Sequence, residues 1–185
     1  MKDREFEKHD TAALAYLNDQ HISNQRTVIL YLAKKIGVNI LSGRSIMNVS
    51  LPIRIFEPRS FLEKTANDFS NTPYFLEKAQ ACSDPLQRFK WISTWQVATL
   101  HLEPQMMKPF NPILGETFQG SFGNYEVILE QISHHPPISA FQIWNASDES
   151  APKVEGHFVF EASTGIRKMT GYKGGDMKIT FPDSG

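Results

Sequence analysis

The sequence predicts an α+β protein in which helices come first and antiparallel strands follow. Up to about residue 102, apolar residues recur at helical spacing in segments that begin with residues typical of helix N-termini. From Thr117 onward, apolar and polar residues alternate in short runs separated by turn residues, which is typical of strands. Between these parts, residues 108–116 contain prolines that favour extended backbone. We therefore expect a helical layer followed by an antiparallel meander, as in a barrel or a sandwich.

The composition is that of a folded, soluble protein and disfavours several classes of function. The chain has 185 residues, of which 41% are hydrophobic and 21% charged, and its net charge of −1 disfavours nucleic-acid binding. The single cysteine, Cys82, excludes an intramolecular disulfide and a four-cysteine zinc site, and it suits a reducing compartment. The first ten residues lack the apolar segment of a signal peptide, and the longest apolar run, Val28–Ala33, is too short to span a bilayer. We therefore expect a cytoplasmic chain.

The N-terminal region predicts two short helices after a frayed, polar start at residues 1–10. The first helix begins near Thr11 and has a small apolar face made by Ala12, Ala13, Tyr16 and Leu17. In the second helix, apolar residues recur at helical spacing at Val28, Ile29, Leu32, Ala33 and Ile36, and Gly37 is a natural C-terminal residue. The pattern favours a helix packed on the core over the alternative, a movable cover or membrane-contacting element.

The next part of the chain predicts one strand and three helices. Ile46–Ile55 contains β-branched residues and a proline, which indicates an edge strand or extended arm. Helices are expected to begin at Glu57-Pro58 and at Thr72-Pro73, the second running through Cys82. Asp84 is a typical N-cap for a last helix that ends near Leu102 and is apolar on more than one face, so we expect it to be mostly buried.

The C-terminal part predicts a series of short antiparallel strands. After a turn at Gly123-Asn124, the side chains of Tyr125, Val127, Leu129 and Gln131 should face one side, against Glu126, Ile128, Glu130 and Ile132. Further strands are expected at Ile138–Asn145, Lys153–Glu161, Ile166–Tyr172 and Asp176–Phe181, with a loop at Ala146–Pro152 and a turn at Gly174-Gly175.

The most unusual stretch is Glu130–Phe141, which places His134 and His135 at the end of a strand before two prolines. Adjacent residues of a strand point to opposite faces of the sheet, and no other His, Cys or carboxylate lies at a sequence spacing typical of zinc sites. A metal site is therefore disfavoured. Ser133 is too close in sequence to His134 for a catalytic pair, and the carboxylates Glu116 and Glu130 form no evident hydrolase pair, so we expect no catalytic residues and no enzyme.

Anion binding is the better chemical explanation of the two histidines. Imidazoles near neutral pH donate hydrogen bonds to phosphate, and a phosphate beside them raises their pKa. Lys108 could add a point charge, and Asn111 a neutral donor, from the proline-flanked segment. Capping of the strand end by the histidines is the alternative, and the residues alone leave both interpretations open.

Three segments resemble the oxysterol-binding-protein-related family. Glu130–Phe141 resembles its signature E-Q-[VI]-S-H-H-P-P-[IV]-S-A-F, and Lys108–Thr117 resembles a second block, K-P-[FL]-N-P-[IFL]-L-G-E. Ser50–Leu62 is similar, more loosely, to a third region. The resemblance covers roughly residues 36–160 in the family's order.

The resemblance implies a helical layer and a large antiparallel β-barrel around a lipid tunnel that an N-terminal lid closes. It implies lipid binding and non-vesicular transfer between membranes, with phosphatidylinositol 4-phosphate exchanged for a sterol or phosphatidylserine, at membrane surfaces or contact sites. His134, His135, Lys108 and Asn111 would bind the phosphoinositide headgroup. The lid would correspond to Val28, Ile29, Leu32, Ile36 and Gly37. No metal or other cofactor is implied.

The family domain is longer than this chain, so the resemblance implies only the first part of the barrel. We expect residues 1–185 to form one domain that is incomplete at its C-terminal end. Residues 1–45 would form the lid and N-terminal helices, 46–105 the first strand and helical layer, and 106–185 the antiparallel strands. An open barrel edge implies either dimerisation or a non-transporting lipid sensor or scaffold as alternatives to transfer.

Overall fold

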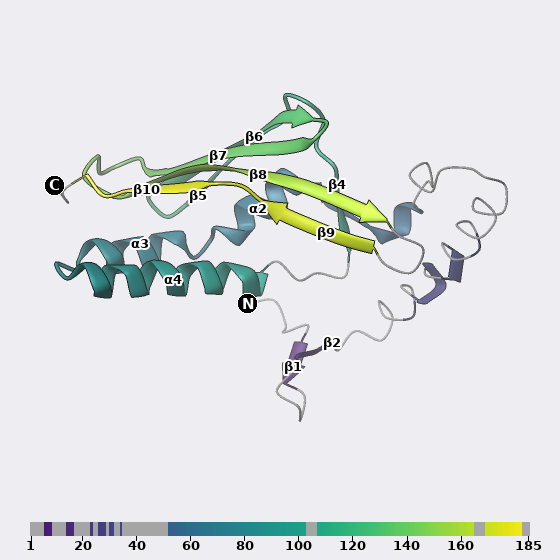
Figure 1. Cartoon of the computed structure of the whole chain (residues 1–185), viewed down its shortest axis with the longest axis horizontal. Coiled ribbons are helices and arrows are strands. Elements are labelled where there is room, and N and C mark those ends of the chain that lie inside the picture. The colour runs from purple at the N-terminus through teal and green to yellow at the C-terminus, as the bar shows by residue number, and fades with distance from the viewer. Residues whose placement is uncertain are drawn as a thin grey trace. The chain divides into compact units, whose positions relative to one another are not determined.

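The computed structural model describes residues 6–8, 14–16, 23, 26–28, 30–31, 34, 52–102, 107–164 and 169–182 (Figure 1). The chain divides into two compact units. The first contains residues 1–57 and 106–108, and the second contains residues 58–105 and 109–185. Each unit is described separately below.

In the first unit, strand β1 (Phe6–Lys8) pairs antiparallel with β2 (Leu14–Tyr16). The prediction of a short helix through Tyr16 is therefore wrong, as is that of a frayed segment at Phe6–Lys8. Backbone pairing between the two segments overrides the helical propensity of the alanine-containing sequence, which is a weak preference. The described residues around Val28 are helical, as predicted, and Val28 is buried. The remaining predicted lid residues, Ile29, Leu32, Ile36 and Gly37, lie outside the described residues.

The predicted helix start at Glu57-Pro58 is also wrong. After a single 3₁₀ turn at Ile53–Ile55, residues Phe56–Ser60 form strand β3, which pairs with β4 (Lys108–Phe110). Helix α2 (Phe61–Asp68) begins after Ser60, whose Oγ accepts a hydrogen bond of 3.2 Å from the Leu62 amide. The serine hydroxyl satisfies one of the free amides at the helix start, so the helix begins there and not at the proline.

Helices α3 (Thr72–Gln80) and α4 (Pro85–Leu102) follow the sequence prediction closely. Asp84 caps α4, because its Oδ1 accepts a hydrogen bond of 3.0 Å from the Leu86 amide. Arg88 ties α4 to the end of α3 by donating to the carbonyl oxygens of Ala79 (3.3 Å) and Cys82 (2.9 Å). The two helices are therefore held side by side at their connection.

The second unit contains a six-stranded antiparallel sheet in the order β10-β8-β7-β6-β5, with β9 also paired to β8. Its strands are β5 (Thr117–Phe122), β6 (Tyr125–His134), β7 (Pro137–Asn145), β8 (Lys153–Thr164), β9 (Met169–Gly174) and β10 (Met177–Thr180). The meander from β5 to β9 confirms the prediction. β10 then returns to the first half of β8, while β9 pairs with the second half. Within the described residues the sheet is open, and the fold class is α+β.

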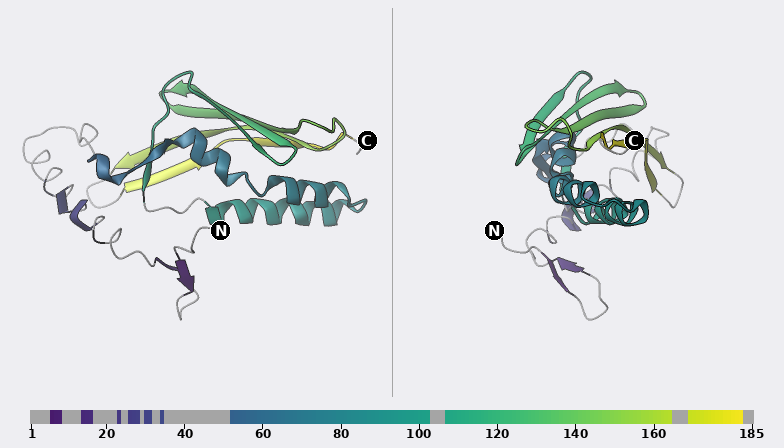
Figure 2. Two further views of the ribbon diagram at one scale, coloured as in Figure 1. Left: turned by 180° about the vertical axis from the view of Figure 1, so that it is seen from behind. Right: turned by 90° about the vertical axis from the view of Figure 1, so that its left-hand side faces the viewer.

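Helices α2, α3 and α4 cover one face of this sheet (Figure 2). The predicted alternation in β6 is confirmed, because Tyr125, Val127 and Leu129 are buried and Glu126 and Glu130 are exposed. These strand residues share one hydrophobic core with side chains from the helices, including Trp95 of α4.

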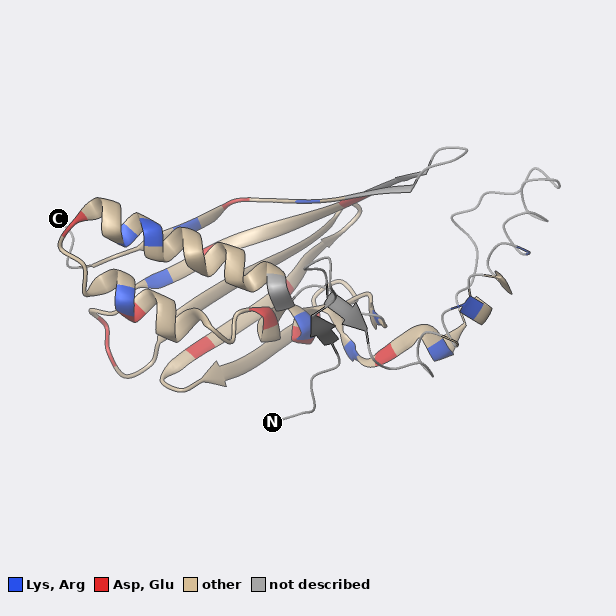
Figure 3. Cartoon of the chain, turned by 90° about the horizontal axis from the view of Figure 1, so that it is seen from below, with Lys and Arg blue, Asp and Glu red and all other residues tan. Residues whose placement is uncertain are grey.

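The prediction that α4 is mostly buried is wrong. Trp95 is fully buried, but the opposite side of the helix exposes Leu86, Phe89, Val97 and Leu100. In the described part of the chain, the core provides packing partners for one side of α4 only. The helix has no acidic residue, and its charges are confined to the region near its start (Figure 3).

Candidate functional site

The two histidines lie at the tip of the hairpin that joins β6 and β7. His134 is the last residue of β6 and pairs with Pro137, the first residue of β7, while His135 and Pro136 form the turn. The first position of a strand tolerates proline, so Pro137 can pair with His134 in the ladder. Both imidazoles are exposed, with ring centroids 4.8 Å apart and an angle of 67° between their planes.

A β-bulge determines the face of the sheet on which His134 lies. The register of β6 and β7 shifts between Gln131 and Ser133, so that Gln131 pairs with Ser139 but Ser133 pairs with Ile138. Strict alternation from Gln131 would put His134 on the opposite face, but the extra residue, Ile132, reverses this. His134 therefore lies on the same face as Gln131, which is the face that the helices cover. The sequence offered no signal for this bulge.

The buried amide of Gln131 fixes the strand at the bulge. Its side chain is only 1% exposed. Oε1 accepts a hydrogen bond of 2.5 Å from the hydroxyl of Ser139, and Nε2 donates one of 2.7 Å to the carbonyl oxygen of Ser133. A buried amide must satisfy its polar atoms, so these bonds hold the strand on both sides of the extra residue.

The loop that contains Asn111 is held rigid by a turn at its far end. The Glu116 amide donates to the Ile113 carbonyl oxygen (3.0 Å), and the Glu116 carboxylate accepts from the Ile113 amide (3.0 Å). Gly115 lies between them with a φ of 78°, a conformation that favours glycine. Glu116, a weak candidate for catalysis from the sequence, is thus occupied in holding this loop.

The loop and the histidine strand meet at Gln131. The Gly115 amide donates to the Gln131 carbonyl oxygen, and the Gln131 amide donates to the Glu116 carbonyl oxygen, both at 2.9 Å. The two segments that stood out in the sequence are therefore joined directly by backbone hydrogen bonds. Asn111 is exposed at the start of this loop, and His134 lies three residues beyond Gln131.

Lys108 belongs to the first unit, unlike Asn111 and the histidines. Its Nζ lies 5.1 Å from the centroid of the Phe56 ring, within range of a cation–π interaction. Burial lowers the pKa of Lys108 from its ordinary value, because a buried ammonium loses hydration.

The described residues contain neither a metal-binding cluster nor a membrane-spanning helix. No group of three or more His, Cys, Asp or Glu side chains there could hold a metal ion. None of the described helices combines the length and the hydrophobicity needed to cross a bilayer.

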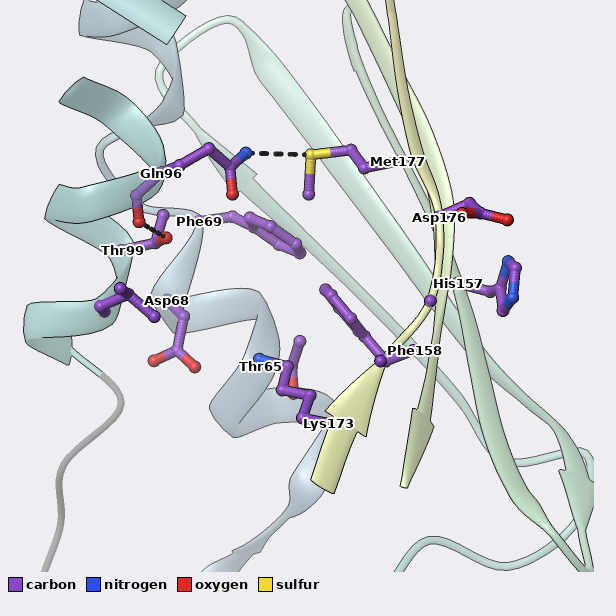
Figure 4. Close-up of a pocket in the computed structure, with 13 residues that line it drawn as sticks. Thr65, Asp68, Phe69, Gln96, Thr99, His157, Phe158, Lys173, Asp176 and Met177 are labelled. Carbon is purple, nitrogen blue, oxygen red and sulfur yellow. Dashed lines mark hydrogen bonds between the residues drawn. The ribbon is translucent and has the colours of Figure 1, made fainter. Parts of the chain in front are cut away.

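The structure adds a cavity of about 270 Å³ between α2, α4 and the sheet. Thr65 and Asp68 of α2, and Phe69 at the end of this helix, face Phe158 and Met177 across it, while the side chains of His157 and Asp176 point to the other side of the strands (Figure 4). The rings of Phe69 and Phe158 are stacked at 6.1 Å. The volume lies just below the usual range of small-molecule pockets, about 300–1,000 Å³, so the cavity can hold a small group or part of a larger molecule.

The cavity was not predicted, although part of its lining was. The sequence placed Phe61, Leu62, Thr65, Ala66 and Phe69 on one face of a helix, and a threonine on an otherwise apolar face was the available signal. The remaining lining comes from α4, from His157 and Phe158 of β8, and from residues around the connection between β9 and β10. That side depends on strand pairing far apart in the sequence.

Comparisons with known proteins cover the part of the chain that contains both the histidine hairpin and the cavity. Residues 37–185 match the family model described as oxysterol-binding protein. The chain is 35% identical over 181 residues to oxysterol-binding protein 9 of Dictyostelium discoideum, which covers 97% of this chain and 42% of that protein. It is 34% identical over 161 residues to oxysterol-binding protein-related protein 3C of Arabidopsis thaliana, which covers 83% of this chain and 32% of the relative.

Solved structures give the same result. The ORD domain of Osh1 in complex with ergosterol matches with a TM-score of 0.64 and 30% identity, over 75% of this chain and 33% of that chain. The ORD of Osh3 from Saccharomyces cerevisiae, in complex with PI(4)P, matches with a TM-score of 0.67 over 85% of this chain and 40% of that chain. At 22% identity, this second likeness is one of fold. The chain spans less than half the length of these relatives.

Proposed function

The chain belongs to the oxysterol-binding protein family, and from this premise we propose that it binds one lipid at a time for transfer between membranes. The lipids proposed are phosphatidylinositol 4-phosphate and, in exchange for it, a sterol, with phosphatidylserine as the alternative second lipid. The observation that carries the proposal is the direct joining of the Asn111 loop to the histidine strand at Gln131. This contact supports the proposal because it links the segment that contains Asn111 to the strand that ends in His134.

The headgroup is proposed to bind at the hairpin tip. His134, His135 and Asn111 offer exposed hydrogen-bond donors, and imidazoles become better phosphate ligands when they are protonated. Lys108 is proposed to supply the remaining charge. An adjacent phosphate would raise the pKa of Lys108 again, and because Lys108 is partly buried, water and salt would screen its attraction to the phosphate less than that of an exposed lysine.

The cavity is proposed to shelter an apolar part of the lipid. Moving a lipid through water without cover costs about 0.8 kcal/mol for each methylene, on the order of 20 kcal/mol for two acyl chains. Apolar cover for the chains is therefore needed, and the rings of Phe69 and Phe158, which line the cavity of the second unit, are proposed to contribute to it. The segment around Val28 is proposed as the lid.

Extraction from liposomes tests this proposal. The chain is mixed with vesicles that contain fluorescent phosphatidylinositol 4-phosphate, and the lipid released into the soluble fraction is measured. We expect extraction by the wild type, a loss of tenfold or more in the His134→Ala/His135→Ala variant, and a smaller loss for Asn111→Ala. Asn67→Ala, at an exposed asparagine on α2, is the matched control and should extract normally. Equal extraction by the double-histidine variant would refute the headgroup site.

A second function is favoured by the size of the cavity. At about 270 Å³ it is smaller than a whole lipid, as expected for a lipid sensor or membrane scaffold that binds lipid without removing it. The same assay distinguishes the two functions. Vesicle binding without release of lipid would favour the sensor, and release would favour the carrier.

A further inference from the structure

One wall of the cavity is polar although the surrounding core is apolar. Asp68 lies three residues after Thr65 on α2, and Phe69, the residue that caps the end of the helix, lies four residues after it. The three side chains therefore share one side of the helix, and all three line the cavity. The ring of Phe69 belongs to the apolar core, whereas the hydroxyl and carboxylate beside it do not. A polar group in such a place requires a partner.

The hydroxyl of Thr65 has no such partner within the described residues. Thr65 is 1% exposed, and its Oγ1 makes no hydrogen bond there. A threonine in a helix ordinarily donates to the carbonyl oxygen three or four residues before it. Thr94 and Thr99 of α4 do this, at 2.8 Å and 2.7 Å. Thr65 does not, and it lines a cavity, so a ligand can supply the missing bond.

The charged residues of this wall compensate each other. Lys64 and Asp68 are 4% and 7% exposed, and the Lys64 ammonium donates to the Asp68 carboxylate one turn away on the same helix. The pair is therefore neutral as a whole. Lys173 also lines the cavity, with its Nζ 4.4 Å from the centroid of the Phe158 ring. Asp68 and Lys173 therefore bring one charge of each sign to the lining, so neither an anionic nor a cationic ligand group is favoured beside Thr65, and an uncharged group fits best.

We propose that Thr65 is a specificity-determining residue that selects a lipid with an uncharged hydroxyl at one end. The hydroxyl would bond to Thr65 Oγ1 on α2, and the adjoining rings or hydrocarbon would pack against Phe69 and Phe158. This inference rests on the proposed function, since it concerns the second lipid of the exchange. It assigns the phosphate-bearing lipid and the hydroxyl-bearing lipid to different polar groups of the protein.

The test compares two probes with three variants of the full chain. The probes are a fluorescent sterol with a single hydroxyl and the same sterol with that hydroxyl replaced by hydrogen. Thr65→Val removes the hydroxyl and keeps the side-chain shape, whereas Thr65→Ser keeps the hydroxyl. Thr72→Val is the matched control, because Thr72 is 0% exposed and its Oγ1 is also without a partner in the described part of the chain, but it does not line the cavity.

We expect the wild type to bind the hydroxyl sterol about five- to tenfold more tightly than the sterol without it. Thr65→Val should abolish this preference by weakening binding of the hydroxyl sterol alone. Thr65→Ser and Thr72→Val should keep the preference. Neither valine variant should unfold more easily than the wild type, because each loses an unpaired buried hydroxyl.

The possible outcomes separate this inference from the proposed function. If the wild type binds both sterols equally, or if Thr65→Val keeps the preference, the inference is overturned and the proposed function stands. If the wild type binds neither sterol and extracts no phosphoinositide, both are overturned. If Thr65→Val fails to fold, Thr65→Ala is measured in its place, and a retained preference there overturns the inference in the same way.

Discussion

Replacing Gln131 by methionine would test how the histidine strand is held. Methionine is close to glutamine in shape, but its thioether sulfur is only a weak acceptor for the Ser139 hydroxyl, and it cannot donate to the Ser133 carbonyl oxygen. The variant therefore removes one of the side-chain bonds that flank the bulge and replaces the strong acceptor of the other by a weak one, while leaving the backbone contacts of Gln131 with Gly115 and Glu116 intact.

The expected cost can be worked out from burial. Each of the two bonds contributes about 0.5–1.5 kcal/mol net. The Ser139 hydroxyl, 1% exposed, would stay buried without its strong acceptor, at a penalty of about 1–3 kcal/mol, whereas the half-buried Ser133 carbonyl can turn to water. The apolar gain from the methionine offsets part of this. We expect the free energy of unfolding to fall by about 2–3 kcal/mol.

Urea unfolding of the full chain measures this cost. Gln142→Met is the matched control, because Gln142 is exposed on the neighbouring strand β7, and its effect should stay within about 0.5 kcal/mol. In a double-mutant cycle, Ser139→Ala should cost at least about 1 kcal/mol less in the Gln131→Met background than in the wild type. A Gln131→Met variant as stable as the wild type, or a Ser139→Ala cost that is the same in both backgrounds, would refute the account of the bulge.

Three further predictions concern the scaffold. Burial, and then the charge of Glu77, raise the pKa of Tyr125 to about 12. The free energy of unfolding should therefore fall by up to about 2–3 kcal/mol as pH rises from about 10 to 12, because the unfolded chain loses the tyrosine proton first. Urea unfolding of Tyr125→Phe should lack this fall, and an equal fall in both proteins would contradict the prediction. Gly115→Ala should cost about 1–2 kcal/mol in chemical denaturation, because a φ of 78° is unfavourable for a residue with a Cβ. The added Cβ would meet no atom within 4 Å, so no steric clash adds to this cost. A neutral result would show that the loop relaxes. Asp84→Ala should cost about 1 kcal/mol by loss of the α4 cap, and Asp84→Ser should restore most of it; equal stability of all three proteins would show that the cap contributes nothing.

Much of the fold could be predicted because local signals agreed with the final structure. The Asp84 cap, the Gly123-Asn124 turn and the alternation from Tyr125 to Gln131 each depend on neighbours close in sequence. The errors arose where distant pairing decides the outcome. Pro58 lies in a strand because β3 pairs with β4, about fifty residues away, and the segment at Leu14–Tyr16 is a strand because it pairs with Phe6–Lys8.

The candidate site was predicted only in part, for the same reason. The histidines and Asn111 stood out by composition, and the family resemblance is confirmed by the match to residues 37–185. Their joining through Gln131 and the bulge that reverses the face of His134 follow from β-sheet register, which a pattern of alternation does not show. The cavity beside Thr65 required two helices and the strands to be in place before it could be recognised.

Native mass spectrometry tests the central claim, that the chain holds one lipid, most directly. The full chain would be incubated with vesicles that contain phosphatidylinositol 4-phosphate and a sterol, separated from them, and weighed. We expect a population heavier by the mass of one lipid, either the phosphoinositide or the sterol but not both together. A chain that binds the vesicles yet is recovered at its own mass, with no lipid, would contradict this claim.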